Sequence, residues 1–297
     1  MYTAVKIVVH TIPPLELVWA RFTIASLVLI GISLVTKQSW KIEKQHWIFI
    51  FLIAIIGNVI SLLFQETGTL LSTAQMGAII TATTPSFMVI FARLILKERI
   101  TLNKILSVLL ATIGVIIIVG VDLNFDSKLG GISLILAALT WALMSVIVKK
   151  VPSHYSQIMI TTYSAILAVI MLTPFVLFRF NAQMISHFSD PAVLSGILYL
   201  GIISTALGFF LWNKGLQLTN ASSGGIFFFL QPVVGVFLGW LILGEQISLY
   251  FWIGTIFIFT GVLMSMRKKE FHEELIEQLP NQPLVLEEVP EEVTENI

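Results

Sequence analysis

The chain has 297 residues and a formal net charge of zero, and 57% of its residues are hydrophobic while only 11% are charged. Soluble domains use roughly 45–50% apolar and about 25% charged residues, so this composition excludes an ordinary soluble domain and indicates an integral membrane protein. The chain has no cysteine and its five histidines form no helical i, i+4 pair, so we expect no metal and no cofactor.

Apolar stretches of roughly 20 residues are long enough to cross the hydrocarbon core of a bilayer as helices. We predict nine such helices, in chain order at 14–35, 47–65, 74–96, 102–121, 130–148, 157–179, 192–213, 222–243 and 249–266. The first residues, MYTAVKIVV (1–9), are apolar but too short to span, and they lack the basic segment and cleavage site of a signal peptide. We interpret them as part of a tenth helix that is truncated at its N-terminus.

The second half of the chain repeats the first. A shift of 147 residues sets LILKERITL (94–102) on LILGEQISL (241–249) and aligns 68–116 with 215–263 without a gap. Of these 49 pairs, 15 are identical, where about five are expected from composition. The sequence therefore predicts a duplicated unit of five helices.

The start of the chain fits the same duplication. A shift of 143 residues sets AVK (4–6) on IVK (147–149) and carries the start of the first helix to a point before Met1. The C-terminal end is rich in Glu and Pro, which is typical of a disordered cytoplasmic segment. The predicted units are a first repeat at 1–121, a second repeat at 129–268 and an acidic tail at 269–297.

An odd number of helices per unit forces the second unit to enter the membrane from the opposite side, which defines an inverted-topology repeat. Charge supports this, because alternate connections differ in their content of Lys and Arg as the positive-inside rule requires. One set holds Lys37, Lys41, Lys44, Lys97, Arg99, Lys104, Lys149, Lys150, Lys214, Arg267, Lys268 and Lys269, and the other holds Lys6, Lys128 and Arg179. We expect a multi-pass protein of the cell membrane with both termini in the cytoplasm.

Three segments and one repeated spacing carry a family resemblance. The segments are WARFTIASLVL in the second helix, AIITATTPSFMVIFARLILKERIT in the fourth and fifth, and GGIFFFLQPVVGVFLGWLILGEQIS in the ninth. The spacing P-x12-E occurs in both halves, at Pro85 to Glu98 and at Pro232 to Glu245. In these features the chain resembles the EamA-type transporters of the drug/metabolite transporter superfamily.

The resemblance implies an all-α polytopic membrane protein with ten transmembrane helices in two inverted five-helix repeats around a central cavity, with the fifth and tenth helices peripheral. It also implies export or exchange of small metabolites. The chain departs from the family at its start, where the Trp-Gly motif of the first helix falls before Met1. The equivalent pair in the sixth helix, Trp141-Ala142, is present.

The residues themselves lead to a compatible function. The sequence has no G-x4-GK-[ST] phosphate loop and no segment large enough for an ATPase, so we expect no ATP-driven pump. It also shows no nucleophile–base pair of the kind that an enzyme would use. We expect a secondary transporter that exports or exchanges amino-acid-like or related solutes by alternating access. The alternatives are a channel or facilitator-type pore and a non-transporting membrane scaffold. The expected partners are a small-molecule substrate and the lipid bilayer, with no nucleic acid. The formation of a homodimer is a further possibility that the sequence does not decide.

Two prolines mark the expected path. Pro85 and Pro232 are predicted in the middle of helices, where each removes a backbone hydrogen bond and kinks the helix. The carbonyls freed at Thr81 and Phe228 are tolerated in a bilayer only if they face protein or a water-filled cavity. We expect both helices to line the path of the substrate, and we expect the two prolines to act as hinges in them. The alternative is that the prolines only shape helix packing.

Polar side chains within membrane spans are costly and tend to face inward. We predict a substrate cavity lined by Asn58, Gln65, Thr81, Thr84, Trp141, Ser145, Ser204, Trp212 and Gln231. For any single member the alternative is interhelical hydrogen bonding, and the two tryptophans have the further alternative of an interfacial belt.

Few ionisable groups fall within the predicted spans. Arg21, near the outer face of the second helix, is expected to gate the outer vestibule or to contact anionic substrate groups. The alternative is a structural role in which it snorkels to the surface or satisfies loose carbonyls. No carboxylate is expected near the middle of the bilayer. If transport is coupled to protons, Glu16 or Glu66, the latter predicted at the end of the third helix, is expected to carry the proton.

Glu98 and Glu245 end the fourth and ninth helices in this prediction. A carboxylate at a helix C-terminus is unfavourable to the helix dipole, so we expect each to accept hydrogen bonds from a neighbouring loop or helix start. Thr101 and Ser248 stand where an N-cap would open the next helix. A direct part in transport is the alternative for the two glutamates.

Overall fold

The structure is a computed structural model. It describes residues 1–99, 101–119, 125–179, 190–219, 221–224, 228, 230–244 and 249–265. Within these ranges every regular element is helical, which confirms the predicted all-α class, and they belong to one unit, Met1–Ser265. Glu245, Ser248 and the predicted tail at 269–297 lie outside the described residues.

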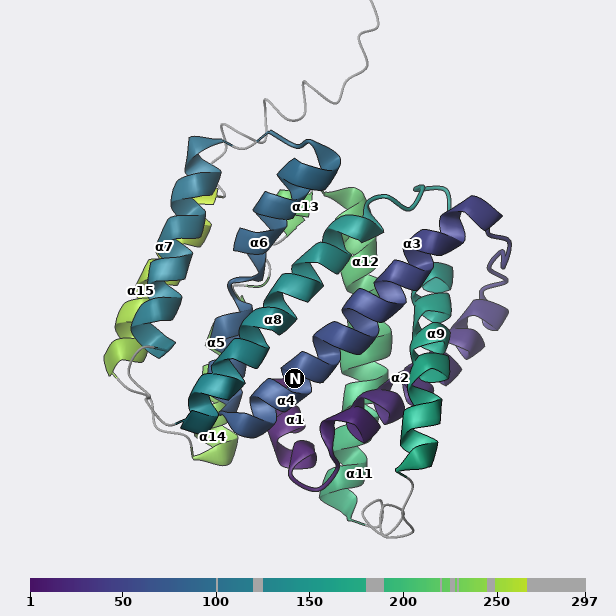
Figure 1. Cartoon of the computed structure of the whole chain (residues 1–297), viewed down its shortest axis with the longest axis horizontal. Coiled ribbons are helices and arrows are strands. Elements are labelled where there is room, and N and C mark those ends of the chain that lie inside the picture. Colours follow the sequence, from purple (N-terminus) through teal and green to yellow (C-terminus); the bar gives the residue numbers. More distant parts are fainter. Residues whose placement is uncertain are drawn as a thin grey trace, which may run out of the picture. The chain divides into compact units, whose positions relative to one another are not determined.

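The helices follow the predicted order (Figure 1). The first half contains α1 (Tyr2–Val9), α2 (Pro14–Val35), α3 (Trp47–Leu52), η2 (Ile53–Ser61), α4 (Leu62–Leu71), α5 (Ala74–Thr81), α6 (Thr84–Phe91), η3 (Ala92–Leu96) and α7 (Leu102–Val119). The second half contains α8 (Phe125–Val148), α9 (Gln157–Phe178), α11 (Pro191–Leu198), η4 (Tyr199–Leu207), α12 (Gly208–Leu218), α13 (Ala221–Gly224), α14 (Leu230–Leu243) and α15 (Leu249–Ser265).

Six helical stretches of the described chain are long and apolar enough to cross a membrane. They are Pro14–Val35, Lys44–Leu71, Ala74–Leu96, Lys128–Val148, Gln157–Phe178 and Pro191–Leu218. Two shorter apolar helices, Leu102–Gly114 and Trp252–Gly261, belong to α7 and α15. The third helix runs to Leu71, further than the sequence predicts, because nothing between Gln65 and Leu71 breaks a helix.

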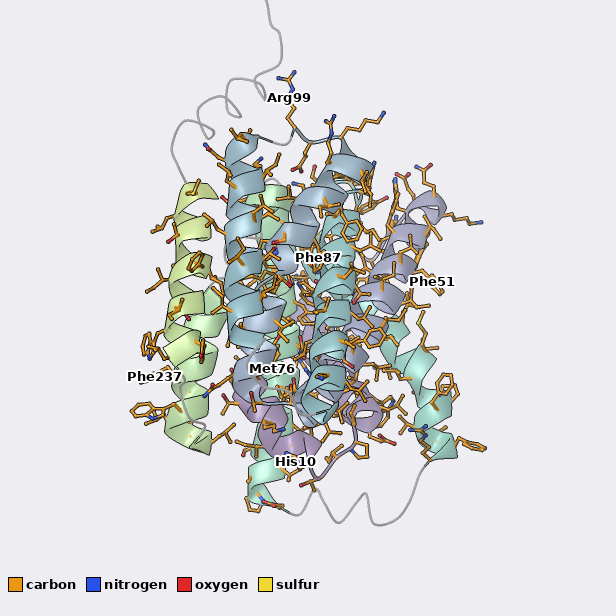
Figure 2. The ribbon with its side chains drawn as sticks, turned by 60° about the vertical axis from the view of Figure 1, so that its left-hand side comes forward. His10, Phe51, Met76, Phe87, Arg99 and Phe237 are labelled. Carbon is orange, nitrogen blue, oxygen red and sulfur yellow. The ribbon has the colours of Figure 1, made fainter. Side chains whose placement is uncertain are left out.

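The outer surface of the bundle is apolar. Large side chains that a soluble domain would bury are exposed, among them Phe51, Phe237 and Phe178, the last with 93% of its surface accessible. Figure 2 shows Phe237 on the outer side of the bundle, while Arg99 extends from one end. Arg21, Asn58 and many hydroxyl side chains are buried instead. This distribution matches a lipid surround, in which polar groups are costly on the outside.

Two helices contain a π-helical segment of nine residues, η2 in the first half and η4 in the second. A shift of 146 residues sets Ile53–Ser61 on Tyr199–Leu207, close to the shift of 147 that aligns the repeated sequences. Within η4 the Thr205 hydroxyl donates to the carbonyl of Leu200, five residues earlier, at 2.7 Å. π-Helical turns are rare and concentrate at functional positions, so each half has the same irregularity at an equivalent point.

The helix around Pro85 is broken rather than kinked, and the prediction of a mid-helix proline is wrong. α5 ends at Thr81 and α6 starts at Thr84, so Pro85 lies in the first turn of a new helix, where its missing N–H costs nothing. The carbonyl of Thr81 accepts a hydrogen bond from the Thr84 hydroxyl at 2.6 Å. In the second half, Pro232 is the third residue of α14, and α13 ends at Gly224.

Helices from both halves pack around the same interior. α8 contacts α4, η2, α5 and α6, and α2 contacts α9 and η4. α1 contacts α4, α5, α11 and α14. α7 packs mainly on α15, and the two lie side by side in Figure 1. The helices other than α7 and α15 therefore surround the interior in which the candidate site lies.

A pair of equivalent glycines tests this packing. A Cβ added at Gly68 in α4 would lie 2.9 Å from the carbonyl oxygen of Gly130 and 2.6 Å from Leu134 Cγ, whereas one added at Gly215 would meet nothing within 4 Å. Gly68→Ala should therefore lower the free energy of unfolding by about 1–3 kcal/mol through overpacking. Gly215→Ala is the matched control. Thermal unfolding in detergent should separate the two, and equal melting temperatures would contradict the α4–α8 packing.

Candidate substrate cavity

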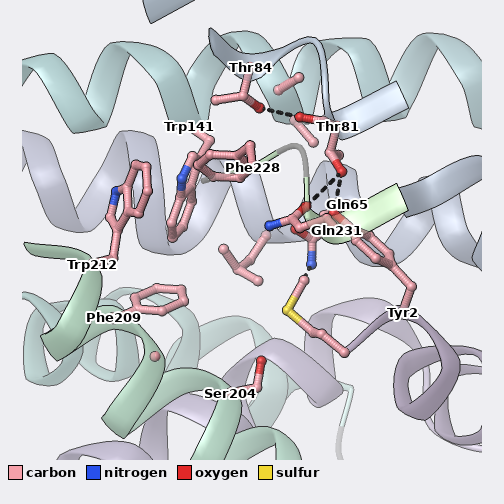
Figure 3. A pocket seen from close by; sticks show the side chains of 15 residues that line it. Tyr2, Gln65, Thr81, Thr84, Trp141, Ser204, Phe209, Trp212, Phe228 and Gln231 are labelled. Carbon is pink, nitrogen blue, oxygen red and sulfur yellow. Dashed lines mark hydrogen bonds between the residues drawn. The ribbon is translucent and has the colours of Figure 1, made fainter. Parts of the chain in front are cut away.

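A cavity of about 180 Å³ lies between helices of both halves. Figure 3 shows it with polar groups gathered toward one end and aromatic rings toward the other. The residues that line it are Met1, Tyr2, Leu62, Gln65, Thr81, Thr84, Ala137, Ala138, Trp141, Ser204, Gly208, Phe209, Trp212, Phe228 and Gln231.

Most residues predicted to line a substrate cavity lie together here. Seven of the nine are in the lining, namely Gln65, Thr81, Thr84, Trp141, Ser204, Trp212 and Gln231. Ser145 is not in the lining, but its hydroxyl accepts a hydrogen bond from Trp212 Nε1 at 3.1 Å and so fixes that ring. Asn58 is buried in η2 away from the cavity, and its Nδ2 has no hydrogen-bond partner among the described residues.

The lining is built from repeat-equivalent positions. The shift of 147 residues that aligns the two halves pairs Leu62 with Phe209, Gln65 with Trp212, Thr81 with Phe228 and Thr84 with Gln231, and all eight of these residues face the cavity. The first half supplies mainly polar side chains at these positions and the second half mainly aromatic ones. The two halves therefore contribute chemically different side chains at positions that align in sequence.

The polar end is a network of hydroxyls and amides. The Tyr2 hydroxyl lies 2.7 Å from Thr81 Oγ1 and 3.3 Å from Gln65 Oε1, and Thr81 Oγ1 lies 3.3 Å from Gln231 Oε1. Both amide oxygens thus face protein hydroxyls, which leaves the amide nitrogens as donors. Among the described residues, Gln65 Nε2 has only the weak acceptor Met1 Sδ, at 3.9 Å. This end is suited to a solute group that accepts hydrogen bonds.

The aromatic end consists of rings in edge-to-face contact. The ring centroids of Trp141 and Phe209 are 4.8 Å apart with planes at 72°, and those of Trp212 and Phe228 are 4.7 Å apart at 83°. Such pairs present a rigid apolar wall. Trp141 Nε1 is buried and has no hydrogen-bond partner among the described residues, so it is a donor available to a solute.

An ion pair lies behind the cavity wall. The guanidinium of Arg21 and the carboxylate of Glu66 are both fully buried, and Nη1 of Arg21 donates to Oε1 of Glu66. Arg21 Nε also donates to Thr205 Oγ1 at 3.1 Å, and Nη2 donates to the lining residue Ser204 at 3.4 Å. The alternative in which Arg21 snorkels to the surface is therefore wrong. Its contact with substrate anions and its gating role stay predictions.

Glu66 also departs from its predicted place. It lies inside α4 rather than at a helix end, and its side chain is fully buried. Glu16, the other candidate proton carrier, is buried in the first turn of α2, and its Oε2 has no partner among the described residues. An acidic residue in the first turn of a helix is favoured by the helix dipole.

The carboxylate that ends the fourth predicted helix reaches another helix start. Glu98 Oε1 accepts a hydrogen bond from the N–H of Ala221, the first residue of α13, at 3.2 Å. At the next helix, the N–H of Lys104 lies 3.4 Å from Thr101 Oγ1, in the geometry of an N-cap. The equivalent glutamate in the second half, Glu245, is outside the described residues.

Residues that the sequence did not single out complete the lining. Met1 and Tyr2 come from the short segment interpreted as a helix fragment, and Leu62, Ala137, Ala138, Gly208, Phe209 and Phe228 are apolar. Apolar residues carry no signal of their own in a chain this hydrophobic. One available signal is helical spacing, since Ser204, Gly208 and Trp212 recur every four residues along one helix face.

Comparison with known proteins decides the family, because the model of the EamA-like transporter family matches residues 1–120 and 128–267. The chain belongs to the EamA-like transporter family. It is therefore a multi-pass membrane protein of a transporter family and not an enzyme.

Relatives and a solved structure agree with this assignment. An uncharacterized transporter of Archaeoglobus fulgidus is 26% identical over 270 residues, which are 90% of this chain and 94% of that protein. YetK of Bacillus subtilis, also named an uncharacterized transporter, is 29% identical over 276 residues, covering 89% of this chain and 82% of that protein. A crystal structure with 17% identity shares the fold of this EamA-like chain, with a TM-score of 0.69 over 89% of this chain and 91% of that one.

The buried ion pair gives a stability prediction. Arg21→Met leaves the Glu66 carboxylate buried without its cation, which should lower the free energy of unfolding by about 3–5 kcal/mol. The double variant Arg21→Met/Glu66→Met removes both charges and should lose much less. Thermal unfolding in detergent measures both, with the exposed Glu43→Gln as a control. A double variant less stable than Arg21→Met would show that the pair is not coupled.

Proposed function

We propose that this chain is a secondary transporter that exports or exchanges small metabolites across the cytoplasmic membrane by alternating access. The observation that carries the proposal is a cavity lined from both halves of the chain by hydrogen-bonding and aromatic side chains. A scaffold without transport activity gains nothing from unpaired donors such as Trp141 Nε1 inside a bilayer, since each costs free energy when no partner is present.

Two inverted five-helix repeats are the proposed architecture. Support comes from the repeated sequence and from π-helical segments at equivalent positions. Inverted repeats give two packings of similar energy related by pseudo-symmetry. These two packings would open the same cavity alternately to each side.

The proposed substrates are small amphipathic solutes of the amino-acid-like kind. The cavity of about 180 Å³ is below the roughly 300–1,000 Å³ of pockets for drug-sized ligands. The donors of Gln65, Gln231 and Trp141 suit a carboxylate or carbonyl, and the rings of Phe209 and Trp212 suit an apolar part of the solute.

Transport itself provides the test. Comparing the metabolites released by cells with and without the gene identifies a solute, which is then measured in proteoliposomes. We expect saturable uptake with counterflow, as a carrier requires, whereas a pore shows neither. Trp212→Leu should reduce uptake at least tenfold by removing part of the wall. Trp240→Leu, which changes an exposed ring on α14, should leave uptake unchanged.

The same proteoliposomes test coupling. Uptake driven by an imposed pH gradient, and lost in Glu66→Gln, would support proton coupling through the buried acid. A rate of uptake that is unchanged by the pH gradient would restrict the mechanism to exchange or facilitated export. Linear, non-saturating flux without counterflow would overturn the carrier proposal in favour of the channel alternative.

The inverted arrangement makes its own prediction. The chain has no cysteine, so single cysteines can be introduced without background. Arg99→Cys and Gly244→Cys, both at exposed positions after equivalent helices, should react with a membrane-impermeant thiol reagent from opposite sides, Arg99→Cys from the cytoplasm. Intact cells and inverted vesicles give the two measurements. Reaction of both cysteines from the same side would contradict an inverted repeat.

A further inference from the structure

The side chain of Lys6 binds the end of a cavity-lining helix. Its Nζ donates to the carbonyls of Thr69 at 3.0 Å and Leu70 at 3.1 Å, and also to the carbonyl of Ser72. α4 ends at Leu71, so these are the carbonyls that a helix leaves without intrahelical partners. A cation at this position is also favoured by the helix dipole.

Lys149 makes a second contact of the same kind. Its Nζ donates to the carbonyls of Leu216 at 2.8 Å and Thr219 at 2.6 Å, at the end of α12. Burial lowers the pKa of the Lys149 amine, and the negative charge of Glu98 opposes this shift. The amine of Lys149 thus binds a helix C-terminus in the same way as that of Lys6.

The two contacts are equivalent in the duplicated sequence. The shift of 143 residues sets Lys6 on Lys149, and the shift of 147 sets Thr69 on Leu216 and Ser72 on Thr219. The side chains of the acceptor residues differ between the halves, but only their backbone carbonyls take part. The same lysine-to-carbonyl contact is therefore made once in each half.

Each contact holds a segment that begins at a π-helical stretch. Residues 62–81 lie between the π-helical η2 and the break before α6, and residues 208–219 follow the π-helical η4. A π-helical stretch at the base of a segment lets the segment move as a unit while its own hydrogen bonds stay formed. We call these segments the first tip and the second tip.

The tips form opposite walls of the cavity. The first tip contributes Leu62, Gln65 and Thr81, and the second tip contributes Phe209 and Trp212. In Figure 1 the end of α4 lies toward the lower end of the bundle, and α13 lies toward the upper end. Moving one tip away from its lysine would open the cavity toward one end only.

We propose that Lys6 and Lys149 are the two gate contacts of the transport cycle, each holding its tip closed by binding the carbonyls at its turn, and that release of one contact at a time opens the cavity to one side of the membrane. Both contacts are formed in this structure, which corresponds to a cavity held at both ends. The proposal rests on the alternating-access function, and the lysines act as positioning residues rather than as substrate ligands.

Accessibility of the cavity tests the proposal without a known substrate. The reporter is Ala138→Cys, a single cysteine in the lining of an otherwise cysteine-free chain. Its rate of reaction with a membrane-impermeant thiol reagent is measured from each side, in cells and in inverted vesicles. Lys6→Met should raise the rate from the outer side several-fold and lower it from the inner side. Lys149→Met should do the reverse.

Two further sets of variants separate gating from loss of structure. Lys6→Arg and Lys149→Arg keep a cationic donor and should restore the balance of the parent reporter. Lys6→Gln and Lys149→Gln keep a neutral donor and should shift the rates with the same signs but by less, which preserves the test if the Met variants fail to insert. The double variant Lys6→Met/Lys149→Met should return the ratio of the two rates toward that of the parent.

The outcomes distinguish this proposal from the function on which it rests. Rates that both lysine substitutions shift in the same direction, or leave unchanged while counterflow persists, overturn the gate contacts but leave the carrier intact. A reporter that reacts equally from both sides in every variant indicates a continuous pore and overturns alternating access itself.

Discussion

Every backbone N–H and C=O group inside a bilayer must find a hydrogen-bond partner within the protein. The structure of this chain depends on how its interrupted helices meet that requirement. Helix ends leave carbonyls and N–H groups unpaired, and a cavity in the membrane needs such ends near it. Lys6 and Lys149 satisfy carbonyls at the ends of α4 and α12, and the Thr84 hydroxyl satisfies the carbonyl at the end of α5. Glu98 pairs with the first N–H of α13. The chain can therefore interrupt its helices beside the cavity without exposing backbone to lipid.

Charge inside the bundle obeys the same constraint. The Arg21–Glu66 pair is fully buried, yet it is separated from the cavity by Ser204, which Arg21 also contacts. A buried pair contributes little net stability, because the desolvation of two charges offsets their attraction. Its value lies in specificity, since it joins α2, α4 and η4 in one arrangement.

Much of the membrane architecture follows from the sequence, and the exceptions have physical causes. Hydropathy locates the long helices, and the cost of burying polar groups in lipid brings Gln65, Thr81 and Gln231 to one cavity. The break at Pro85 was not predictable from the proline alone, because a kinked helix and a new helix start both accommodate a missing N–H. The pairing of Glu66 with Arg21 was missed because it joins residues 45 positions apart on different helices, and hydropathy carries no information on such contacts.

The duplication separates what the backbone does from what the side chains do. At the gate contacts the acceptors are carbonyls, so Thr69 and Leu216 serve equally well although their side chains differ. In the cavity the equivalent positions Gln65 and Trp212 also differ, and there the difference matters because each side chain faces the cavity. A duplicated chain can thus retain two matching lysine-to-carbonyl contacts while its two cavity walls diverge, one toward hydrogen-bond donors and one toward aromatic rings. Because the walls are unlike, the proposed transport cycle would hold a solute in one favoured orientation, whichever end of the cavity is open.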